Sequence, residues 1–340
     1  MVFVTGGTGL VGRHLVDELL KEGHDVHALC RPTTNRRQLE DFLGQCGTAH
    51  DRLTWVEGSL EDGMFLEEAL ENCSRVYHCA ALVSFHRKDA EVLKRINQDA
   101  TGTLVNAMLQ AGVPEMVHIS SVAALGRKRG EPVHEDVPFE DGRDVSAYAR
   151  SKFGAELEVW RGQEEGLRVL TVNPVIVLGP GDFTRSSSML FTLVHRGLKW
   201  YPTGSNGFVS ARDVARAATM LSTNGCWGER FVVCAENSSY RHLMTLMAEA
   251  MGVRAPHRPL RRWMMGAAWR LSAGWEFISG RRAPISKESV ETTHRHHDYV
   301  TDKLERALAA KGVEWQYQSL KETVAVTVPF LFEALGPPPK

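Results

Sequence analysis

The run from Tyr148 to Lys152 (Tyr-Ala-Arg-Ser-Lys) contains a phenol and an ammonium that could carry out acid–base chemistry. On a helix, side chains four residues apart share a face, so Tyr148 and Lys152 point the same way. A fixed cation nearby stabilises the phenolate and lowers the pKa of the tyrosine. Such a phenol can donate a proton to a developing alkoxide. An isolated pair of this kind is common on helix surfaces, so other positions must support it.

A pair of serines supports an acid–base role for Tyr148 and Lys152. Ser120 and Ser121 lie at the end of an apolar run that predicts a strand. Ligands of open parallel sheets bind at the carboxyl ends of the strands. A serine hydroxyl there can donate a hydrogen bond to the same substrate oxygen as Tyr148.

A glycine-rich turn, Gly-Gly-Thr-Gly-Leu-Val-Gly at Gly6–Gly12, follows the first expected strand and opens the first expected helix. Gly6 permits the sharp turn, Gly9 lets a pyrophosphate approach the backbone, and Gly12 lets the helix pack closely on the strand. The helix N-terminus offers free N–H groups to phosphates. This context predicts a dinucleotide site.

The end of the second expected strand indicates which nicotinamide cofactor is bound. A carboxylate there would hold the ribose hydroxyl of NAD, but the chain has Arg31 instead, followed by Arg36 and Arg37. Arginine accommodates the 2′-phosphate of NADP. We therefore expect NADP (as NADPH) and consider NAD the weaker candidate. Arg36 and Arg37 could equally begin a solvated helix.

These residues need a scaffold of alternating strands and helices, which the apolar patterning predicts. Expected strands are Val2–Thr5, Asp25–Leu29, Leu53–Val56, Val76–Ala80, Met116–Ser120, Arg168–Val172 and Arg230–Val233. Expected helices are Leu10–Glu22, Gln38–Gly44, Met64–Glu71, Ala90–Gln110, Ser146–Glu164, Tyr240–Met251, Pro259–Ser279 and Asp302–Ala310, with a strand and a helix within Phe208–Ser222. Apolar strands alternating with helices predict an α/β fold with a Rossmann-type doubly wound parallel sheet.

Proline and glycine punctuate the chain after Asn173 and make the alternation irregular. We expect residues 1–173 to form an NADP-binding Rossmann domain to which 207–234 returns. Residues 174–206 and 235–335 would form a smaller, discontinuous C-terminal substrate domain, and 336–340 a disordered tail.

Composition limits the possible functions. The 340 residues carry a net charge of −1, without the clustered positive surface that nucleic acid requires. We expect no signal peptide, because the start of the chain is already strand-like, and no integral membrane segment, because no apolar run is long enough for one. We expect a soluble cytoplasmic enzyme. Residues 261–279 mix tryptophan with basic residues; a packed helix is the preferred interpretation, and membrane contact the alternative.

No metal site is expected. The six cysteines lack metal-like spacing and suggest buried reduced thiols. The run 294–298 is rich in histidine, but adjacent histidines cannot converge on one ion without an irregular backbone.

Taken together, the motifs resemble the extended short-chain dehydrogenase/reductase superfamily, of the NAD-dependent epimerase/dehydratase type. The matches occur in the family's order from Thr5 to about Val233. They are the glycine turn, His78–Ala81, Asn97 within Ile96–Thr103, Ser120-Ser121, Tyr148–Lys152, Asn173-Pro174 and Gly207–Ala215.

The resemblance implies roles for these positions. Tyr148 would be the general acid/base, Lys152 would hold the nicotinamide ribose and tune Tyr148, and Ser121 would be the catalytic serine, with Ser120 the weaker choice. Asn97 would order a water in a proton relay. Further cofactor contacts would come from Gly6, Thr8, Gly9, Leu10, Val11, Gly12, Ser59, Leu60, Ala80, Ala81, Ile119, Asn173, Pro174 and Val175. Ser59 stands where the family often has an adenine-binding aspartate.

The segment 173–182 resembles that of dihydroflavonol-4-reductase and 3β-hydroxysteroid dehydrogenase relatives more than that of nucleotide-sugar epimerases. The first hypothesis is therefore reduction of a ketone or aldehyde on a fairly apolar small molecule, with Ser84 and Phe85 as substrate-pocket walls beside Ser121 and Tyr148. A nucleotide-sugar epimerase, dehydratase or reductase is the second hypothesis. Its diphosphate would be held by Arg185, Arg212 or Arg216.

A third hypothesis is a catalytically silent NADP-binding sensor. The resemblance also implies a homodimer formed through the helices at 90–110 and 146–164.

Overall fold

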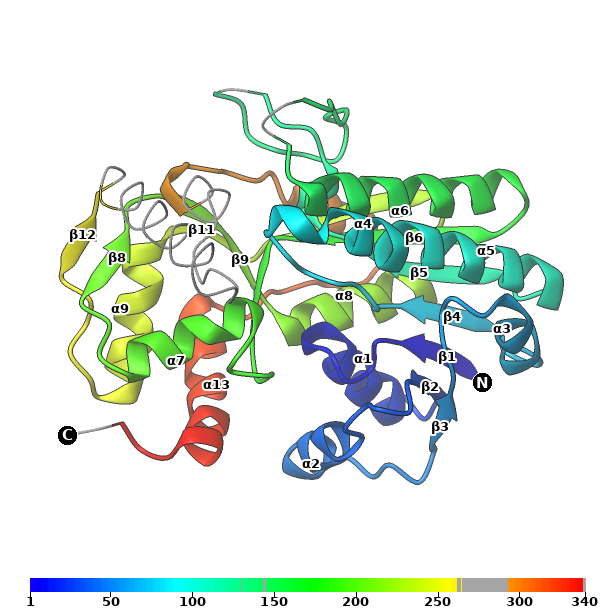
Figure 1. Cartoon of the computed structure of the whole chain (residues 1–340), viewed down its shortest axis with the longest axis horizontal. Helices are drawn as coiled ribbons and strands as arrows, with labels where there is room; N and C mark the ends of the chain where they lie inside the picture. The colour runs from blue at the N-terminus through cyan, green and yellow to red at the C-terminus, as the bar shows by residue number, and fades with distance from the viewer. Residues whose placement is uncertain (129, 143–144, 262–263, 265–292, 339–340) are drawn as a thin grey trace.

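The computed structural model describes residues 1–128, 130–142, 145–261, 264 and 293–338. Its largest element is a parallel sheet of seven strands in the order β10-β6-β5-β4-β1-β2-β3 (Figure 1). The strands are β1 (Val2–Thr5), β2 (Val26–Cys30), β3 (Leu53–Glu57), β4 (Arg75–His78), β5 (Glu115–Ile119), β6 (Arg168–Pro174) and β10 (Glu229–Val233).

The sheet is doubly wound. The chain builds β1, β2 and β3 outward in one direction and then returns to place β4, β5 and β6 on the other side of β1. Val4 of β1 pairs with Ala28 on one side and Tyr77 on the other. The point of reversal, between β1 and β4, is where such sheets bind ligands at the carboxyl ends of their strands. The predicted Rossmann-type fold is confirmed.

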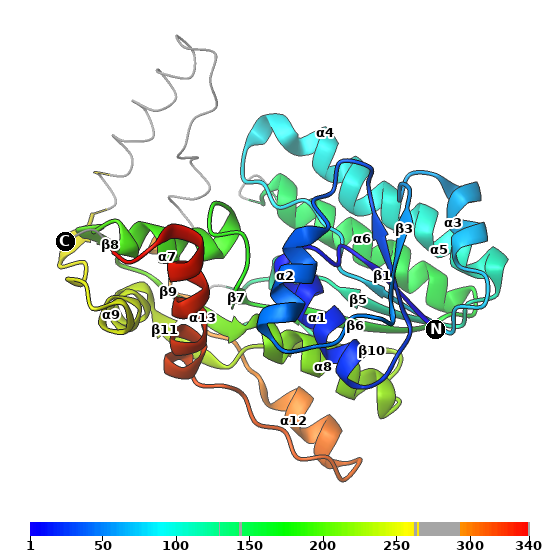
Figure 2. The ribbon, with the colours of Figure 1, turned by 90° about the horizontal axis from the view of Figure 1, so that it is seen from below.

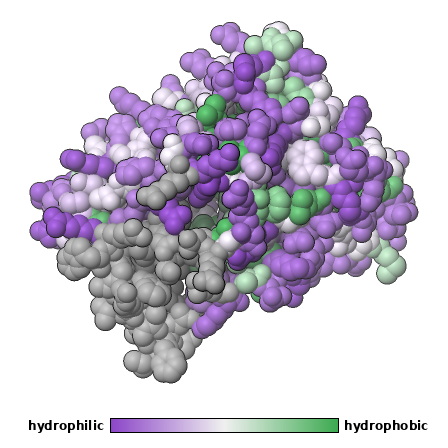
Figure 3. Space-filling view, turned by 90° about the horizontal axis from the view of Figure 1, so that it is seen from above, coloured by the Kyte–Doolittle hydropathy of each residue, from purple (hydrophilic) through white to green (hydrophobic). Residues whose placement is uncertain are grey.

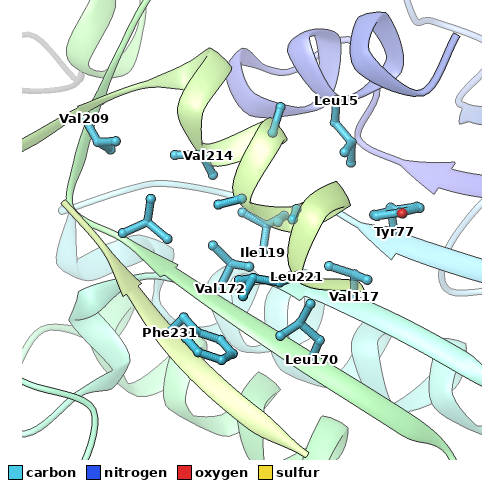
Figure 4. Packing of buried hydrophobic residues seen from close by; sticks show 14 of the residues in the cluster. Leu15, Tyr77, Val117, Ile119, Leu170, Val172, Val209, Val214, Leu221 and Phe231 are labelled. Atoms are coloured by element: carbon cyan, nitrogen blue, oxygen red, sulfur yellow. The ribbon is translucent and has the colours of Figure 1, made fainter. Parts of the chain in front are cut away.

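Helices cover both faces of the sheet (Figure 2). They are α1 (Leu10–Lys21), α2 (Arg37–Gln45), α3 (Gly63–Ala69), α4 (Ala90–Leu93), α5 (Ala100–Ala111), α6 (Ala147–Glu164), α8 (Ala211–Thr223) and α12 (Asp302–Ala309). Alternate strand residues point to opposite faces. Val4 therefore joins a core with α1, α2, α8 and α12, whereas Phe3 joins a core with α3, α5 and α6. Figure 4 shows Leu15, Val214 and Leu221 of the first core over Val117 and Val172 of the sheet.

Serine and aspartate side chains fix where several helices begin. Ser146 accepts a hydrogen bond from the backbone N–H of Ala149, and Ser210 accepts one from Asp213. Asp62 caps α3 in the same way. These caps satisfy N–H groups that have no partner within a helix. The Ser146 cap sets the first turn of α6, and hence the position of Tyr148.

The expected helix at 90–110 is interrupted. The chain forms α4, then a π-helical segment at Lys94–Asp99, then α5. Such π-helical turns often occur at functional sites. Here it contains Asn97, whose buried carboxamide bonds to a neighbouring loop instead of facing solvent.

A smaller lobe follows β6 and has its own core of phenylalanines, leucines and methionines. It contains β7 (Ile176–Leu178), β9 (Ser205–Ser210) and β11 (Glu236–Ser239) in one sheet, and β8 (Trp200–Pro202) and β12 (Arg258–Leu260) in another. Its helices are α7 (Met189–His195), α9 (Tyr240–Met251) and α13 (Leu320–Leu335).

The expected helix at Pro259–Ser279 is wrong at its start, because Pro259 pairs with Tyr201 across β12 and β8. Nearly all of the remainder of that range, including most of 261–279, lies outside the described residues. In the described part of the chain, no helix is long and apolar enough to span a bilayer.

The substitution Leu15→Ala tests the packing of α1 on the sheet. Leu15 is fully buried between α1 and the sheet, so its truncation should lower the free energy of unfolding by about 2–5 kcal/mol. Urea denaturation of Met64→Ala serves as the control, since Met64 is 80% exposed and its loss should change stability by less than about 0.5 kcal/mol. Equal effects of the two substitutions would contradict the packing described here.

Candidate active site

The glycine turn joins β1 to α1 with little free space. Gly6 has a φ of +69°, and a Cβ there would lie 2.6 Å from the backbone nitrogen of Ala80. A Cβ on Gly12 would lie 2.1 Å from the carbonyl oxygen of Gly6. Gly9 caps α1 without a side-chain hydrogen bond, which leaves the first N–H groups of the helix available. The turn therefore fits a pyrophosphate, as the sequence predicts.

Arg13 supports this turn and was missed by the sequence analysis. Its buried guanidinium donates to the carbonyl oxygens of Thr8 (2.9 Å) and Gly9 (3.3 Å) and lies 5.5 Å from the ring centre of Phe42. The carbonyl groups of Thr8 and Gly9 are therefore oriented toward the guanidinium of Arg13. Its position directly after the third glycine was the only sequence signal.

The three arginines after β2 differ in their contacts. Arg36 forms an ion pair with Glu57 at the end of β3 and lies over Trp55. Arg31 and Arg37 are exposed, and no ion pair engages them within the described chain. Arg36 is therefore engaged by a carboxylate, whereas the guanidinium groups of Arg31 and Arg37 have no carboxylate partner among the described residues. Ser59, which follows β3, accepts a hydrogen bond from the N–H of Glu61.

Ala80 and Ala81 follow β4 beside the glycine turn. The N–H of Ala80 donates to the Thr5 hydroxyl at 3.2 Å. Asn97 holds the next residue: its carboxamide accepts from the N–H of Leu82 at 2.7 Å and donates to the Leu82 carbonyl at 2.9 Å. Asn97 also donates to the Ser151 hydroxyl on α6. Through these hydrogen bonds, the Asn97 side chain fixes the backbone at Leu82, just before Ser84 and Phe85.

Tyr148 lies half-buried in the first turn of α6. Burial raises the pKa of its phenol, and a hydrogen bond with Ser121 opposes that rise. This differs from the lowered pKa expected from the sequence, because the Lys152 amine is directed to a carbonyl group instead. The ring of Phe85 meets Tyr148 edge-on, with the ring centres 5.6 Å apart. Phe85 remains 38% exposed, so it offers an apolar surface beside the phenol.

Lys152 is buried one helical turn after Tyr148, with 1% of its surface exposed. Its Nζ donates to the carbonyl oxygen of Ile119, at the end of β5, at 3.0 Å. Burial lowers the pKa of this amine to about 8, while the charges of Glu156 and Cys79 oppose the shift. The ammonium is thus fixed at the carboxyl edge of the sheet.

Glu156, one further turn along α6, was also missed. Its carboxylate is 1% exposed and accepts hydrogen bonds from the Ser120 hydroxyl and the Asn173 carboxamide, both at 2.5 Å. Arg230 on β10 lies 3.4 Å from its other oxygen. Glu156 therefore joins α6 to the ends of three strands. The four-residue spacing from Lys152 was the sequence signal that could have identified it.

These contacts separate the two serines. Ser120 is buried against Glu156, whereas Ser121 shares a hydrogen bond with Tyr148. Asn173, expected beside the nicotinamide, donates to both Glu156 and the Ser121 carbonyl oxygen. Pro174 ends β6, and Val175 bonds through its N–H to the Val233 carbonyl. The sequence motifs thus converge on one edge of the sheet.

Two buried histidines lie beside the Lys152 amine. His78 and His118 stack with ring centres 5.2 Å apart. Burial, followed by the charge of Lys152, lowers the pKa of His78 to about 3 and that of His118 well below its usual value. Both rings are therefore neutral at physiological pH and add no positive charge next to the ammonium.

A parallel sheet with a dinucleotide turn and a tyrosine–lysine pair at its switch point defines a nicotinamide-dependent oxidoreductase. Residues 2–234 match the model of the NAD dependent epimerase/dehydratase family. The chain belongs to this family, within the extended short-chain dehydrogenase/reductase superfamily, and is an NAD(P)-dependent oxidoreductase.

Individual relatives are consistent with this family assignment. The "Putative dihydroflavonol 4-reductase" of Synechocystis sp. is 30% identical over 78% of this chain and 77% of its own. Sterol demethylase protein B of Methylococcus capsulatus is 32% identical over 74% of this chain and 75% of its own. Among solved structures, that of gox2253 is similar with a TM-score of 0.81 and 26% identity, and covers 99% of both chains.

The buried amine gives a pH prediction for stability. The pKa of Lys152 is lower in the folded protein (about 8) than in the unfolded chain (about 10.4), so the unfolded state binds more protons between these values. Lys152 therefore destabilises the fold below pH 8, and this cost disappears as the pH rises toward 10.

Lys152→Met removes this titration. The free energies of unfolding of the variant and the parent protein are compared by urea denaturation. The stability of the variant relative to the parent should be greatest near pH 7 and should fall by up to about 1.4 kcal/mol per pH unit above pH 8. A difference that stays constant from pH 7 to 10 would show that the amine is not held at the depressed pKa.

Proposed function

We propose that the protein uses NADPH to reduce the carbonyl group of a fairly apolar small molecule, with Tyr148 as the proton donor. The observation that carries this proposal is the placement of the half-buried Tyr148 phenol between the Ser121 hydroxyl and the Phe85 ring, one turn from a buried Lys152. The glycine turn, which has no room for side chains at Gly6 or Gly12, supports dinucleotide binding beside it.

The contacts suggest how these groups divide the work. Tyr148 and Ser121 would both hydrogen-bond to the substrate carbonyl oxygen and so orient it. Bound NADPH supplies the hydride. Because burial raises the pKa of Tyr148, the phenol is protonated at neutral pH and can donate its proton to the developing alkoxide. The Lys152 ammonium would hold the nicotinamide ribose and stabilise the phenolate that remains.

Asn97 would act mainly through position. Its carboxamide fixes the backbone at Leu82, and so the start of the segment that carries Ser84 and Phe85. Ser84 itself donates to Asp89 at 2.7 Å, which orders the same segment. Ser84 and Phe85 would line the substrate pocket, as the sequence suggests.

The described contacts favour a reductase over an enzyme of nucleotide sugars. Of the three arginines that could hold a diphosphate, Arg185 pairs with Asp182 at 3.4 Å and Arg216 pairs with Asp213 at 3.0 Å. Arg212 is exposed and forms no ion pair within the described residues. The exposed aromatic edge of Phe85 suits an apolar substrate better than a sugar. The names of the two relatives, one a dihydroflavonol 4-reductase and one a sterol demethylase protein, point to the same substrate class.

The proposed unit is a homodimer formed through α4 to α6, within the ranges 90–110 and 146–164. Leu157 on α6 and Val92 on α4 are large apolar side chains that are 51% and 37% exposed. Seen from above, the described surface is mostly hydrophilic, with hydrophobic residues in scattered patches (Figure 3). Residues 1–173 with 207–234 would bind the cofactor, and 174–206 with 235–335 would complete the substrate pocket. Two elements cross this division, since β9 lies in a sheet of the smaller lobe and α12 packs on the large sheet.

The proton donor is tested by Tyr148→Phe. NADPH oxidation, measured with a panel of aromatic ketones, aldehydes and sterol-type ketones, should fall about 10²- to 10⁴-fold, because the variant has no phenolic proton to donate. NADPH affinity should change little, and Tyr201→Phe should retain full activity. Undiminished turnover by Tyr148→Phe would overturn the proposal, as would a preference for UDP-, GDP- or dTDP-sugars in the same assay.

The cofactor preference is tested by Arg31→Ala. If Arg31 contacts the 2′-phosphate, the variant should bind NADPH about 10- to 100-fold more weakly, as expected for a lost charge-assisted hydrogen bond, and NADH almost unchanged. Fluorescence titration with both cofactors measures this. Arg306→Ala on α12, also exposed, is the matched control. Equal weakening for NADPH and NADH would argue against a 2′-phosphate contact.

A further inference from the structure

One end of the smaller lobe concentrates positive charge. The segments 185–206 and 240–261 contain seven of the chain's 40 Lys and Arg residues but one of its 41 Asp and Glu residues, Glu249. The chain as a whole has a net charge of −1, so this excess is local. These segments include β8, α9 and β12, which lie together at the end of the molecule opposite α3 (Figure 1).

Four of these seven cations lie on the paired strands β8 and β12, on α9 and in the loop between α9 and β12, or directly next to these elements. β8 and β12 pair in parallel, and the backbone N–H of Arg258 donates to the Lys199 carbonyl at 3.0 Å. We define the basic face as Lys199, Trp200, Tyr201, Arg241, Arg254 and Arg258. All four of its cationic side chains are exposed. Within the described residues, none of them forms an ion pair with a carboxylate.

Elsewhere in the described chain, several arginines have a carboxylate partner. Arg161 pairs with Glu158 and Glu165, and Arg150 pairs with Asp141. An unpaired cation close to others of the same sign raises the local positive potential, which attracts anions. The basic face therefore gathers four such cations on neighbouring elements, with no carboxylate partner among the described residues.

Two aromatic rings lie under its guanidinium groups. Arg258 lies 5.5 Å from the ring centre of Trp200, and Arg241 lies 5.4 Å from that of Tyr201. Both rings are partly buried, and Tyr201 also packs against the core of the lobe. Basic residues interleaved with tryptophan and tyrosine are typical of surfaces that rest at the boundary between lipid headgroups and acyl chains.

We propose that the basic face docks the protein on a membrane surface that carries anionic phospholipid headgroups. The cations match the charge of the headgroups, and the amphipathic rings suit the interfacial depth. Nucleic acid fits less well, because single-stranded binding uses aromatic faces that are free to stack on bases. Here Tyr201 is held between Arg241 and the core. This inference does not depend on the proposed reaction.

Vesicle co-sedimentation of the full chain tests the docking. Vesicles of phosphatidylcholine alone are compared with vesicles that contain about one third phosphatidylglycerol, at low salt and in 0.5 M NaCl. The test variant is Lys199→Gln/Arg254→Gln/Arg258→Gln, and the control is Lys128→Gln/Lys311→Gln/Lys321→Gln, which removes the same charge from exposed lysines elsewhere. Thermal unfolding of both variants checks that each one is folded.

The proposal predicts sedimentation with the anionic vesicles only, release by salt, and affinity at least about tenfold lower for the test variant but unchanged for the control. Absence of binding to anionic vesicles would overturn it, as would equal weakening in both variants. Binding of poly(U) RNA through the same residues, without binding to vesicles, would also overturn it and identify a nucleic-acid surface instead. NADPH oxidation of a water-soluble substrate should be the same in all three proteins.

Discussion

The structure of this site depends on keeping the Lys152 ammonium buried at the edge of the sheet. A charged amine removed from water is unfavourable unless polar groups surround it. The Ile119 carbonyl accepts its hydrogen bond, Glu156 supplies a compensating charge one turn away, and the neighbouring histidines remain neutral. Because these groups come from β5 and α6, the helix must press on the strand ends in one fixed position. The same position of the helix places Tyr148 beside Ser121 and Phe85.

The other half of the site depends on the backbone. The turn after β1 excludes side chains at Gly6 and Gly12, and Arg13 donates hydrogen bonds to the carbonyl groups of Thr8 and Gly9 within it. Helix α1 therefore presents its N–H groups to the region beside Ala80 and Tyr148. The glycine turn and the Tyr148–Lys152 pair are held at the same edge of the sheet, since β1 and β5 both flank β4 and end at that edge.

Much of this architecture could be predicted because its signals are local. Apolar periodicity gave the strands and most helices, and the four-residue spacing placed Tyr148 and Lys152 on one face. The partners of Lys152 and Arg36 could not be predicted, since Ile119 and Glu57 come from distant segments that only the folded sheet brings near. The expected single helix at 90–110 is interrupted by a π-helical segment that contains Asn97, and the contact of Asn97 with the Leu82 backbone has no local sequence pattern.

Helix α13 was missed for a different reason. Its capping box, Ser319 with Glu322, is a local helix signal in the sequence, whereas Pro329 inside the helix is a residue type that usually interrupts one. The charge balance of the smaller lobe was likewise present in the sequence and was overlooked, because the cations are dispersed along the chain and meet only when β8 pairs with β12.

A crystal structure of the protein with NADPH bound tests the central claim most directly. The account predicts the pyrophosphate at the N-terminus of α1, the nicotinamide ring beside the Tyr148 phenol, and the ribose hydroxyls within hydrogen-bond distance of the Lys152 Nζ. A nicotinamide bound away from Tyr148, or an amine that contacts only Ile119 when the cofactor is present, would contradict it.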